Sequence, residues 1–403
     1  MKTNSLLHTP EGVRDIYGDE LQRKLSLEEK LRETIRSFGY NDIETPSFEY
    51  FDIYSKEIGT TPSKEIYKFF DSENNTLALR PDFTPGVVRS AVKYFMEDEL
   101  PIKLVYLGNT FSNRSDLQGK LKEITELGVE HLGNASADAD AEMIYMAVCL
   151  LRTAGLKDFQ ICLGTEEYFR GLCEAAGLEN EDRADLSEHI RNKNYFGTMD
   201  FIESLDIKDN VKNALAAFSD FAGDVEILDS AYELAKGIKR SEAAIERLKN
   251  VYDLLKIYGV ENYVSFDLGM LSKREYYTGI VFRAYTFGTG DAIIRGGRYD
   301  NLLVKFGKDV AATGFTVVID ELMNTLSAQH IDISLDLKRA IVAYDEKSLA
   351  EALRLCEELR ADGVDTEMLS IAFSEEKLKM RAKNLGNAKL YFVIDGERKE
   401  EEL

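Results

Sequence analysis

The chain has 403 residues, 44% of them hydrophobic, which is enough to bury the cores of two or three domains. Its formal net charge of −22 argues against a polyanionic partner such as RNA, because binding phosphates depends on Lys and Arg side chains that neutralise them. There is no run of about 18 apolar residues and no apolar signal core near the first residue, so we expect a cytoplasmic protein without transmembrane helices.

The cysteines and histidines indicate no metal centre. Cys149, Cys162, Cys173 and Cys356 form no CxxC pair and no metal-ligand spacing, so we expect four buried free thiols in a reducing compartment. The four histidines are scattered along the chain. Neither a metal nor another cofactor is therefore predicted.

The N-terminal region reads as a helix followed by extended chain. Apolar residues at helical spacing predict a helix over 19–38, and Gly39 is its expected C-cap. Residues 40–54 read as an extended segment broken at Pro46. Residues 75–95 then read as a strand, a turn and a helix.

A long hairpin follows. It has an extended segment at 103–107, a polar loop at 113–119 and a return segment that ends at 126–133. Residues 138–154 predict an apolar helix, and a strand is expected directly after it, at 159–164.

From 166 to about 256 the charge is dense and strand signals vanish, which predicts a helical insertion. Strand character returns at 263–270, 274–286 and 291–303. This later pattern is typical of hairpins in an antiparallel sheet.

A change of composition near 326–337 marks a domain boundary. The residues after it predict a small α/β unit of the kind joined by parallel crossovers. The expected elements are a strand at 340–344, a helix at 348–362, a strand at 365–369, a helix at 375–385 and a strand at 390–394. The final stretch, "DGERKEEEL", reads as a charged and frayed tail.

Seven motifs in chain order together resemble histidyl-tRNA synthetase. They are "TPEGVRDIYGDE" (9–20), "FGYNDIETPSFE" (38–49), "LALRPDFTPGVVR" (77–89), "ELGVEHLG" (126–133), "REYYTGIVF" (274–282), "GGRYDNLLVKFG" (296–307) and "TGFTVVIDEL" (313–322). A single one of these would be weak, but the ordered set is specific.

The resemblance implies an α+β fold. We expect a class II aminoacyl-tRNA synthetase-like antiparallel sheet with flanking helices over 1–325, carrying the helical insertion at about 166–256. A truncated, anticodon-binding-like α/β domain is expected at 338–403. The family dimerises through the helix and strand of its first motif, which here are the 19–38 helix and the strand ending at Pro46.

The resemblance also shows that the phosphate side of the site has changed. Where the family places three arginines that meet the α-phosphate, this chain has Ser112, Ser272 and Glu321. The glutamate that reads adenine is replaced by Arg114. The three arginine positions thus lose four units of positive charge.

That loss bears on amino-acid activation, in which fixed cations stabilise charge that builds on the phosphate. One close pair of opposite charges is worth about 4 kcal/mol at an effective dielectric of 20. We therefore expect no measurable adenylation. Arg114 restores a cation two residues away, pointing across the pleat if the strand continues. Lys273 and Arg274 offer a replacement for the second arginine only after a local shift.

The amino-acid side is better kept. By resemblance, Asp82 grips the α-amino group with Thr84 as its hydroxyl partner, and Glu130 meets the imidazole. Tyr277 and Tyr299 match aromatic walls, whereas Glu126 replaces a glutamine. The candidate histidine-binding residues are Asp82, Thr84, Glu126, Glu130, Tyr276, Tyr277 and Tyr299.

Each of these residues also has a plainer interpretation. Tyr276 and Tyr277 read as strand residues with one facing the core and one facing water, and "GGRYD" reads as a hairpin turn with glycines at positive φ. The glutamates of "ELGVEHLG" read as solvated surface acids. Asp82, directly after a proline, reads as a turn or N-cap residue.

A synthetase-like body without these arginines resembles a non-catalytic branch of the family, the regulatory subunits of ATP phosphoribosyltransferase, which serve the first step of histidine biosynthesis. This resemblance implies a short catalytic subunit as partner, histidine as effector, and a dimer inside a hetero-oligomer. Two alternatives stay open: a stand-alone histidine-binding or tRNA-mimicking module, and a working histidyl-tRNA synthetase with relocated cations.

Overall fold

The computed structural model describes residues 7–54, 61–95, 100–114, 120–272, 276–335, 338–371, 374–386 and 388–401. The chain forms two compact units, Met1–Ile333 and Ser334–Leu403. The division falls inside the stretch 326–337, where the composition changes. Each unit has a hydrophobic core of its own.

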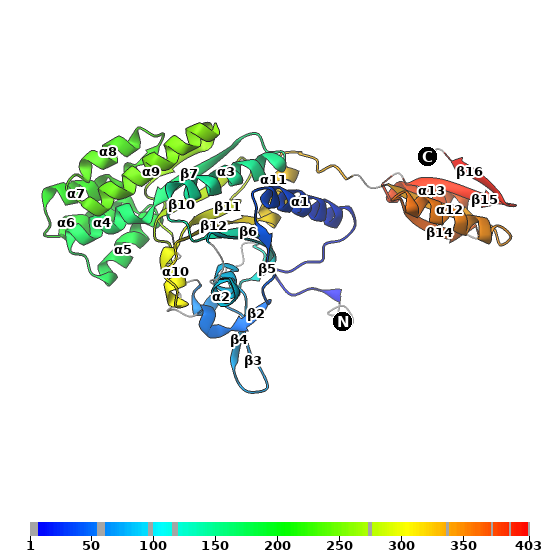
Figure 1. Cartoon of the computed structure of the whole chain (residues 1–403), viewed down its shortest axis with the longest axis horizontal. Helices are drawn as coiled ribbons and strands as arrows, with labels where there is room; N and C mark the ends of the chain where they lie inside the picture. The colour runs from blue at the N-terminus through cyan, green and yellow to red at the C-terminus, as the bar shows by residue number, and fades with distance from the viewer. Residues whose placement is uncertain are drawn as a thin grey trace. The chain divides into compact units, whose positions relative to one another are not determined.

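A nine-stranded sheet forms the centre of the first unit, in the order β1-β5-β6-β12-β11-β10-β7-β9-β8 (Figure 1). Its middle strands, from β5 to β7 in this order, pair antiparallel, which confirms the predicted sheet; β1 with β5 and β7 with β9 are parallel. The strands are β1 (Asn41–Asp42), β5 (Ile102–Phe111), β6 (Glu123–Leu132), β7 (Phe159–Thr165), β8 (Ala222–Gly223), β9 (Val264–Asp267), β10 (Ile280–Thr286), β11 (Ile294–Arg298) and β12 (Ala312–Val318).

Helices cover both faces of this sheet. One face carries α1 (Gly18–Ser37), α3 (Ala137–Thr153) and α11 (Ile319–Ala328), and the other carries α2 (Thr84–Tyr94) and α10 (Asp300–Lys305) (Figure 1). The first three helices pack on the main core of the unit. The candidate site lies on the opposite side, in a second apolar cluster between the sheet, α2 and α10.

Helix α1 follows the pattern that predicts it. Leu27, Leu31 and Ile35 recur at every fourth position and are all buried. The helix ends where Gly39 takes a φ of +83°, a left-handed conformation that favours glycine after a helix.

The predicted insertion is helical. Its helices are α4 (Glu166–Ala176), α5 (Asn180–Arg191), α6 (Tyr195–Ser204), α7 (Asp209–Ala216), α8 (Ile227–Leu234) and α9 (Lys239–Tyr258). The prediction that strands are absent from this stretch is wrong at one point, because Ala222 and Gly223 of β8 pair with β9 at the edge of the sheet. Two residues are too few to give an alternating pattern in the sequence.

A buried charge cluster joins the insertion to the sheet. Asp140 on α3 forms ion pairs with Arg298 from β11, at 2.8 Å, and with Arg247 from α9, at 2.7 Å. Asp140 and Arg298 are 2% and 6% exposed. Because an unpaired charge at such depth is costly, the three side chains hold their elements together.

A small sheet in the order β2-β4-β3 lies beside α2. Its strands are β2 (Phe48–Tyr50), β4 (Thr76–Leu79) and β3 (Lys68–Phe70). Phe48 and Tyr50 of β2 and Phe69 of β3 lie opposite leucines of β4, so they share one face of the small sheet. These three rings are 51%, 57% and 37% exposed.

The second unit is a four-stranded sheet in the order β14-β13-β15-β16. Parallel pairing of β13 with both β14 and β15 confirms the predicted crossovers. The elements are β13 (Arg339–Tyr344), α12 (Leu349–Ala361), β14 (Asp365–Ser370), α13 (Glu375–Asn384), β15 (Lys389–Ile394) and β16 (Glu397–Glu401).

The predicted frayed tail is wrong. Residues Glu397–Glu401 form β16, which pairs antiparallel with β15. Arg398 reaches back to Glu351 and Glu358 on α12, at 2.8 and 2.9 Å. Charged side chains of β16 such as Arg398 therefore face side chains of opposite charge. The number of charged residues in the sequence does not reveal these pairs, so it predicted a frayed tail instead of a strand.

The four cysteines are free, as expected, but only Cys173 and Cys356 are buried. Cys149 and Cys162 are half-buried, so the expectation of four buried thiols is wrong for these two. Burial still raises the pKa of Cys162 to about 11, which leaves it protonated at neutral pH. Within the described residues, no group of three or more His, Cys, Asp or Glu side chains is arranged to hold a metal ion.

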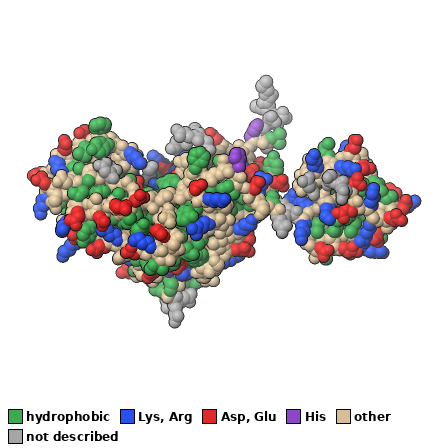
Figure 2. Space-filling model, turned by 90° about the horizontal axis from the view of Figure 1, so that it is seen from above, with side chains coloured by type: hydrophobic (Ala, Val, Ile, Leu, Met, Phe, Trp, Pro, Cys, Tyr) green, Lys and Arg blue, Asp and Glu red, His purple; other side chains and the backbone are tan. Residues whose placement is uncertain are grey.

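The described helices include none that is both long and apolar enough to cross a membrane. On the face seen in Figure 2, acidic and basic side chains are interspersed over each unit. The visible part of the described surface is therefore mixed in charge and does not form a single basic stripe of the kind that follows a nucleic-acid backbone.

Candidate functional site

The β5–β6 hairpin supplies the floor of the site. Its register pairs Tyr106 with Gly128 and Leu104 with Glu130, so the residues with even numbers on both strands share one face. Glu126 and Glu130 are therefore neighbours on that face. They are 7% and 1% exposed, so the interpretation of both as solvated acids is wrong. The part of the hairpin loop at 115–119 lies outside the described residues.

Glycines on the next strands make room for the acid. Gly314 on β12 lies opposite Glu130, and a Cβ there would approach the Glu130 Oε2 to 2.1 Å. Gly297 on β11 lies opposite Gly314, and a Cβ there would meet the ring of Tyr277 at 2.8 Å. These glycines lie in strands without a positive φ, so the hairpin-turn interpretation of "GGRYD" is wrong. They serve close approach of side chains.

Glu130 is held by a tyrosine. The Tyr299 hydroxyl, buried at the N-cap of α10, donates a short hydrogen bond to Glu130 Oε2. Burial raises the pKa of Tyr299 well above 10, and the nearby carboxylate of Glu130 raises it further. The phenol therefore stays protonated and stays a donor.

Asp82 forms the second carboxylate–tyrosine pair. Its Oδ2 accepts a hydrogen bond from the Tyr276 hydroxyl at 3.2 Å, and its Oδ1 accepts one from the Thr84 backbone N–H at 3.1 Å. Asp82 and Tyr276 are 2% and 4% exposed. The bond to Thr84 is the turn interaction that the plainer interpretation expects, and the bond to Tyr276 links the same acid to the other candidates.

The three tyrosines form one cluster. The ring centroids of Tyr276 and Tyr277 are 5.0 Å apart, and those of Tyr276 and Tyr299 are 5.8 Å apart. Both Tyr276 and Tyr277 precede β10 and both are buried, so the interpretation of them as strand residues facing opposite ways is wrong. The structure brings all seven candidates to the same side of the sheet.

Sequence reasoning missed three residues of this cluster. Arg80 is 7% exposed and lies 4.0 Å from the ring centre of Phe83, which stacks on Tyr106 at 4.4 Å. Burial lowers the pKa of Arg80, and the charge of Glu126 opposes that shift. Two signals in the sequence could have found them. Phe83 lies between the candidates Asp82 and Thr84, and Tyr106 is on the same face of the hairpin as Glu126.

Residues at the positions where the resemblance expects phosphate-binding groups have other partners in the structure. Ser112 follows β5 and donates its backbone N–H to Lys122. Arg114 is no longer in the strand, so it does not point across the pleat; it is exposed and pairs with Glu65 at 2.8 Å. The rescue by Lys273 and Arg274 concerns residues outside those described.

The other two replaced positions have structural partners. Ser272 donates its backbone N–H to Glu166 at 2.5 Å. Glu321 lies half-buried in the first turn of α11, where its carbonyl accepts the hydroxyl of Thr325. The arrangement as a whole can offer carboxylates and phenols to a small cationic or imidazole-bearing ligand, and Ser112, Ser272 and Glu321 supply no positive charge to it.

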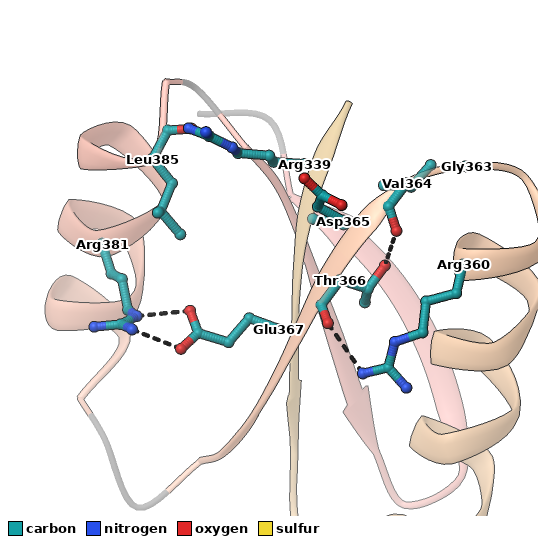
Figure 3. A pocket seen from close by; sticks show the side chains of 10 residues that line it. Arg339, Arg360, Gly363, Val364, Asp365, Thr366, Glu367, Arg381 and Leu385 are labelled. Atoms are coloured by element: carbon teal, nitrogen blue, oxygen red, sulfur yellow. Dashed lines mark hydrogen bonds and ion pairs between the residues drawn. The ribbon is translucent and has the colours of Figure 1, made fainter. Parts of the chain in front are cut away.

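A groove of about 810 Å³ opens separately in the C-terminal unit, along β14 and between α12 and α13 (Figure 3). Three arginines line it, and each is already engaged. Arg381 forms two bonds to Glu367, at 2.6 and 2.7 Å. Arg360 donates to the carbonyl of Thr366, and Arg339 donates to the carbonyl that follows α13. Because the three arginines already bind partners within the protein, the groove gives no reason to expect a charged ligand.

The comparisons with known proteins agree on one family. The family model for histidyl-tRNA synthetase matches residues 12–322. The ATP phosphoribosyltransferase regulatory subunit of Ruminiclostridium cellulolyticum is 36% identical over 394 residues, covering 97% of this chain and 93% of that protein.

Solved structures give the same result. An ATP phosphoribosyltransferase regulatory subunit/histidyl-tRNA synthetase from Bacillus halodurans has a TM-score of 0.85 at 29% identity, covering 96% of this chain and 98% of that one. The histidyl-tRNA synthetase of Nostoc sp. PCC 7120 has a TM-score of 0.79 at 18% identity, covering 98% and 96%. The second likeness concerns the fold alone. Together they confirm the predicted class II synthetase-like architecture.

Proposed function

This chain belongs to the histidyl-tRNA synthetase family and, within it, to the ATP phosphoribosyltransferase regulatory subunits, and on that premise we propose that it activates a short catalytic subunit and carries the histidine feedback. The pathway is histidine biosynthesis. The chain itself performs no catalysis. Its relatives are named for the regulatory role and not for an enzymatic one.

The observation that carries the proposal is the division of the site into two halves. On the phosphate half, Ser112, Ser272 and Glu321 stand at the positions of three cations, and Arg114 is bound by Glu65. On the amino-acid half, the carboxylates and tyrosines remain buried together. Binding without activation is what a sensor derived from a synthetase requires.

Histidine is the ligand that this half fits. The carboxylate of Glu130 suits an imidazole N–H, and Asp82 suits an α-ammonium group. Both acids are held by tyrosine hydroxyls in the structure, so histidine must compete with those bonds. Breaking these tyrosine–carboxylate hydrogen bonds offsets part of the free energy of histidine binding, so we expect moderate affinity.

Feedback then requires a difference between states. A ligand shifts an equilibrium only by its differential affinity, so histidine must bind one state of the assembly more tightly than another. We propose that the subunit pairs with a second copy inside this assembly, through α1 and the extended segment up to Pro46; the strand expected to end at Pro46 is shorter in the structure, where β1 ends at Asp42. We further propose that the class II-like body spans residues 1–325 and the small α/β domain residues 338–403.

The experiment that tests the pocket combines Glu130→Ala with Tyr277→Phe in the assembled complex. The double change removes the acid for the imidazole and one neighbouring hydroxyl, so we expect histidine inhibition to weaken at least ten-fold. Inhibition is measured as phosphoribosyltransferase rate against histidine concentration. Glu130→Gln removes the charge but keeps the shape of the side chain, so weaker histidine inhibition in this variant as well would not be explained by loss of folding.

A matched control uses the same residue types outside the pocket. Glu123→Ala with Tyr285→Phe changes β6 and β10 where Glu123 pairs with Asn109 and Tyr285 is exposed. This control should leave histidine inhibition as in the wild type. An unchanged inhibition midpoint in the pocket variants would show that histidine is sensed elsewhere.

A further inference from the structure

The first turn of the insertion contacts both ends of the stretch that carries Tyr276 and Tyr277. Glu166 opens α4, and its backbone N–H donates to the Gly279 carbonyl at 3.1 Å. Its side-chain Oε1 accepts the backbone N–H of Ser272 at 2.5 Å. One residue thus bonds to the chain before and after the two tyrosines.

Arg170, one helical turn later on α4, adds a third contact. Its Nη2 donates to the backbone carbonyl of Tyr277 at 2.7 Å. From the end of α5, the Arg191 Nη1 reaches the carbonyl of Ser272 at 3.4 Å. These partners are backbone atoms, so the bonds hold the described chain at Ser272, Tyr277 and Gly279 whatever side chains these positions carry.

The described part of this stretch, 276–279, lies before the paired residues of the sheet. Strand β10 begins at Ile280, after both tyrosines, and Thr278 makes one backbone bond to Arg298. The position of the Tyr276 hydroxyl relative to Asp82, and of the Tyr277 ring over Gly297, therefore depends on where α4 holds the backbone.

We propose that Glu166 and Arg170 are positioning residues for the histidine pocket, through which the helical insertion sets the placement of the two tyrosines. The inference rests on the proposed function, because the pocket is the histidine site named there. It adds a route by which a change in the insertion reaches the pocket. Burial of Glu166, which is 8% exposed, keeps water from replacing its bond to Ser272.

The test compares Arg170→Met with Arg240→Met in the full chain. Arg240, on α9, pairs with Glu167 and Glu174 of the same helix α4, and among the described residues its ion pairs go to these two glutamates. Histidine affinity is measured by titration calorimetry, and the melting temperature by calorimetric scanning. We expect Arg170→Met to weaken histidine binding at least five-fold, Arg170→Lys to recover part of the loss, and Arg240→Met to lower the melting temperature without changing affinity.

Equal affinities in Arg170→Met and the wild type would overturn the inference, as would an equal loss in both methionine variants. A ligand-free measurement separates it from the proposed function. Hydrogen exchange at 276–280 should accelerate in Arg170→Met and stay slow in Arg240→Met. If the wild type binds no histidine, the proposed sensor fails, yet the exchange result still decides whether α4 positions the tyrosines; equal exchange in both variants contradicts it.

Discussion

Among the buried side chains of the sheet, His131 has an unusual environment. It lies on β6 at 2% exposure, on the face opposite Glu130, and its Nε2 has no hydrogen-bond partner in the described structure. Tyr40 is 3.4 Å from its Nδ1, and the pair of Glu142 with Lys103 lies beside it. Burial lowers the pKa of His131 from 6.5 to about 4, and the charge of Glu142 opposes that shift.

That shift predicts a pH dependence of stability. Between pH 6.5 and 4 the unfolded chain binds a proton at this imidazole and the folded chain does not, so stability present above pH 6.5 is lost as the pH falls through that window. The full shift corresponds to about 3 kcal/mol. We expect His131→Phe, which keeps a ring beside Tyr40, to flatten the dependence. Urea unfolding at a series of pH values measures it, and parallel curves for the two proteins would contradict the account.

The residues of the site were predictable to different degrees. The spacing of Glu126 and Glu130 on one strand implies a shared face, and the structure agrees. The pairing of Glu130 with Tyr299 joins residues 169 positions apart, which no local pattern encodes. The ion pair of Arg114 with Glu65 likewise depends on the loop after β5 meeting a short 3-10 helix, Ser63–Glu65, that lies 49 residues earlier in the chain.

Elements were predicted best where the pattern was long. The helix over 19–38 appears within a residue of expectation, because its long stretch repeats one period. The β5–β6 hairpin was predicted at the right place, but β5 runs to Phe111, four residues beyond the expected segment at 103–107. Strands β8 and β16 were missed, since one is two residues long and the other consists of charged residues. Their strand conformation comes from pairing with β9 and β15, which is a tertiary effect.

The exposed rings of the small sheet carry a prediction about assembly. Phe48, Tyr50 and Phe69 form an outward aromatic face that begins two residues after Pro46, the end of the extended segment proposed for the dimer contact. A contiguous apolar face of this kind marks an interaction surface. We expect Phe48→Glu with Phe69→Glu to weaken self-association at least ten-fold by sedimentation analysis.

Phe70 provides the matched control for this test. It is 70% exposed on the same strand, but it is the next residue after Phe69 and so points to the opposite face. Phe70→Glu should leave the association constant unchanged. If the double variant and Phe70→Glu weaken self-association equally, the cause is a general effect on solubility. If neither weakens it, this face is not part of the dimer interface.

The whole molecule combines a synthetase-like body, a helical insertion tied to it by Asp140 and its two arginines, and a separate small α/β unit. The net charge of −22 opposes a polyanion such as a tRNA backbone, and acidic and basic side chains are interspersed on the face seen in Figure 2. By its resemblance to the synthetases, the proposed histidine pocket would keep groups that recognise an amino acid, while Ser112, Ser272 and Glu321 stand where phosphate-binding arginines are expected. On the proposed function, binding at this pocket acts through the catalytic partner.

The most direct measurement is therefore a phosphoribosyltransferase assay of the short catalytic subunit from the same organism, with and without this protein. We expect activity that appears or rises strongly only on mixing, that falls again when histidine is added, and that needs no histidine adenylation by this chain. An intact catalytic subunit whose rate is unchanged by this protein would contradict the regulatory role.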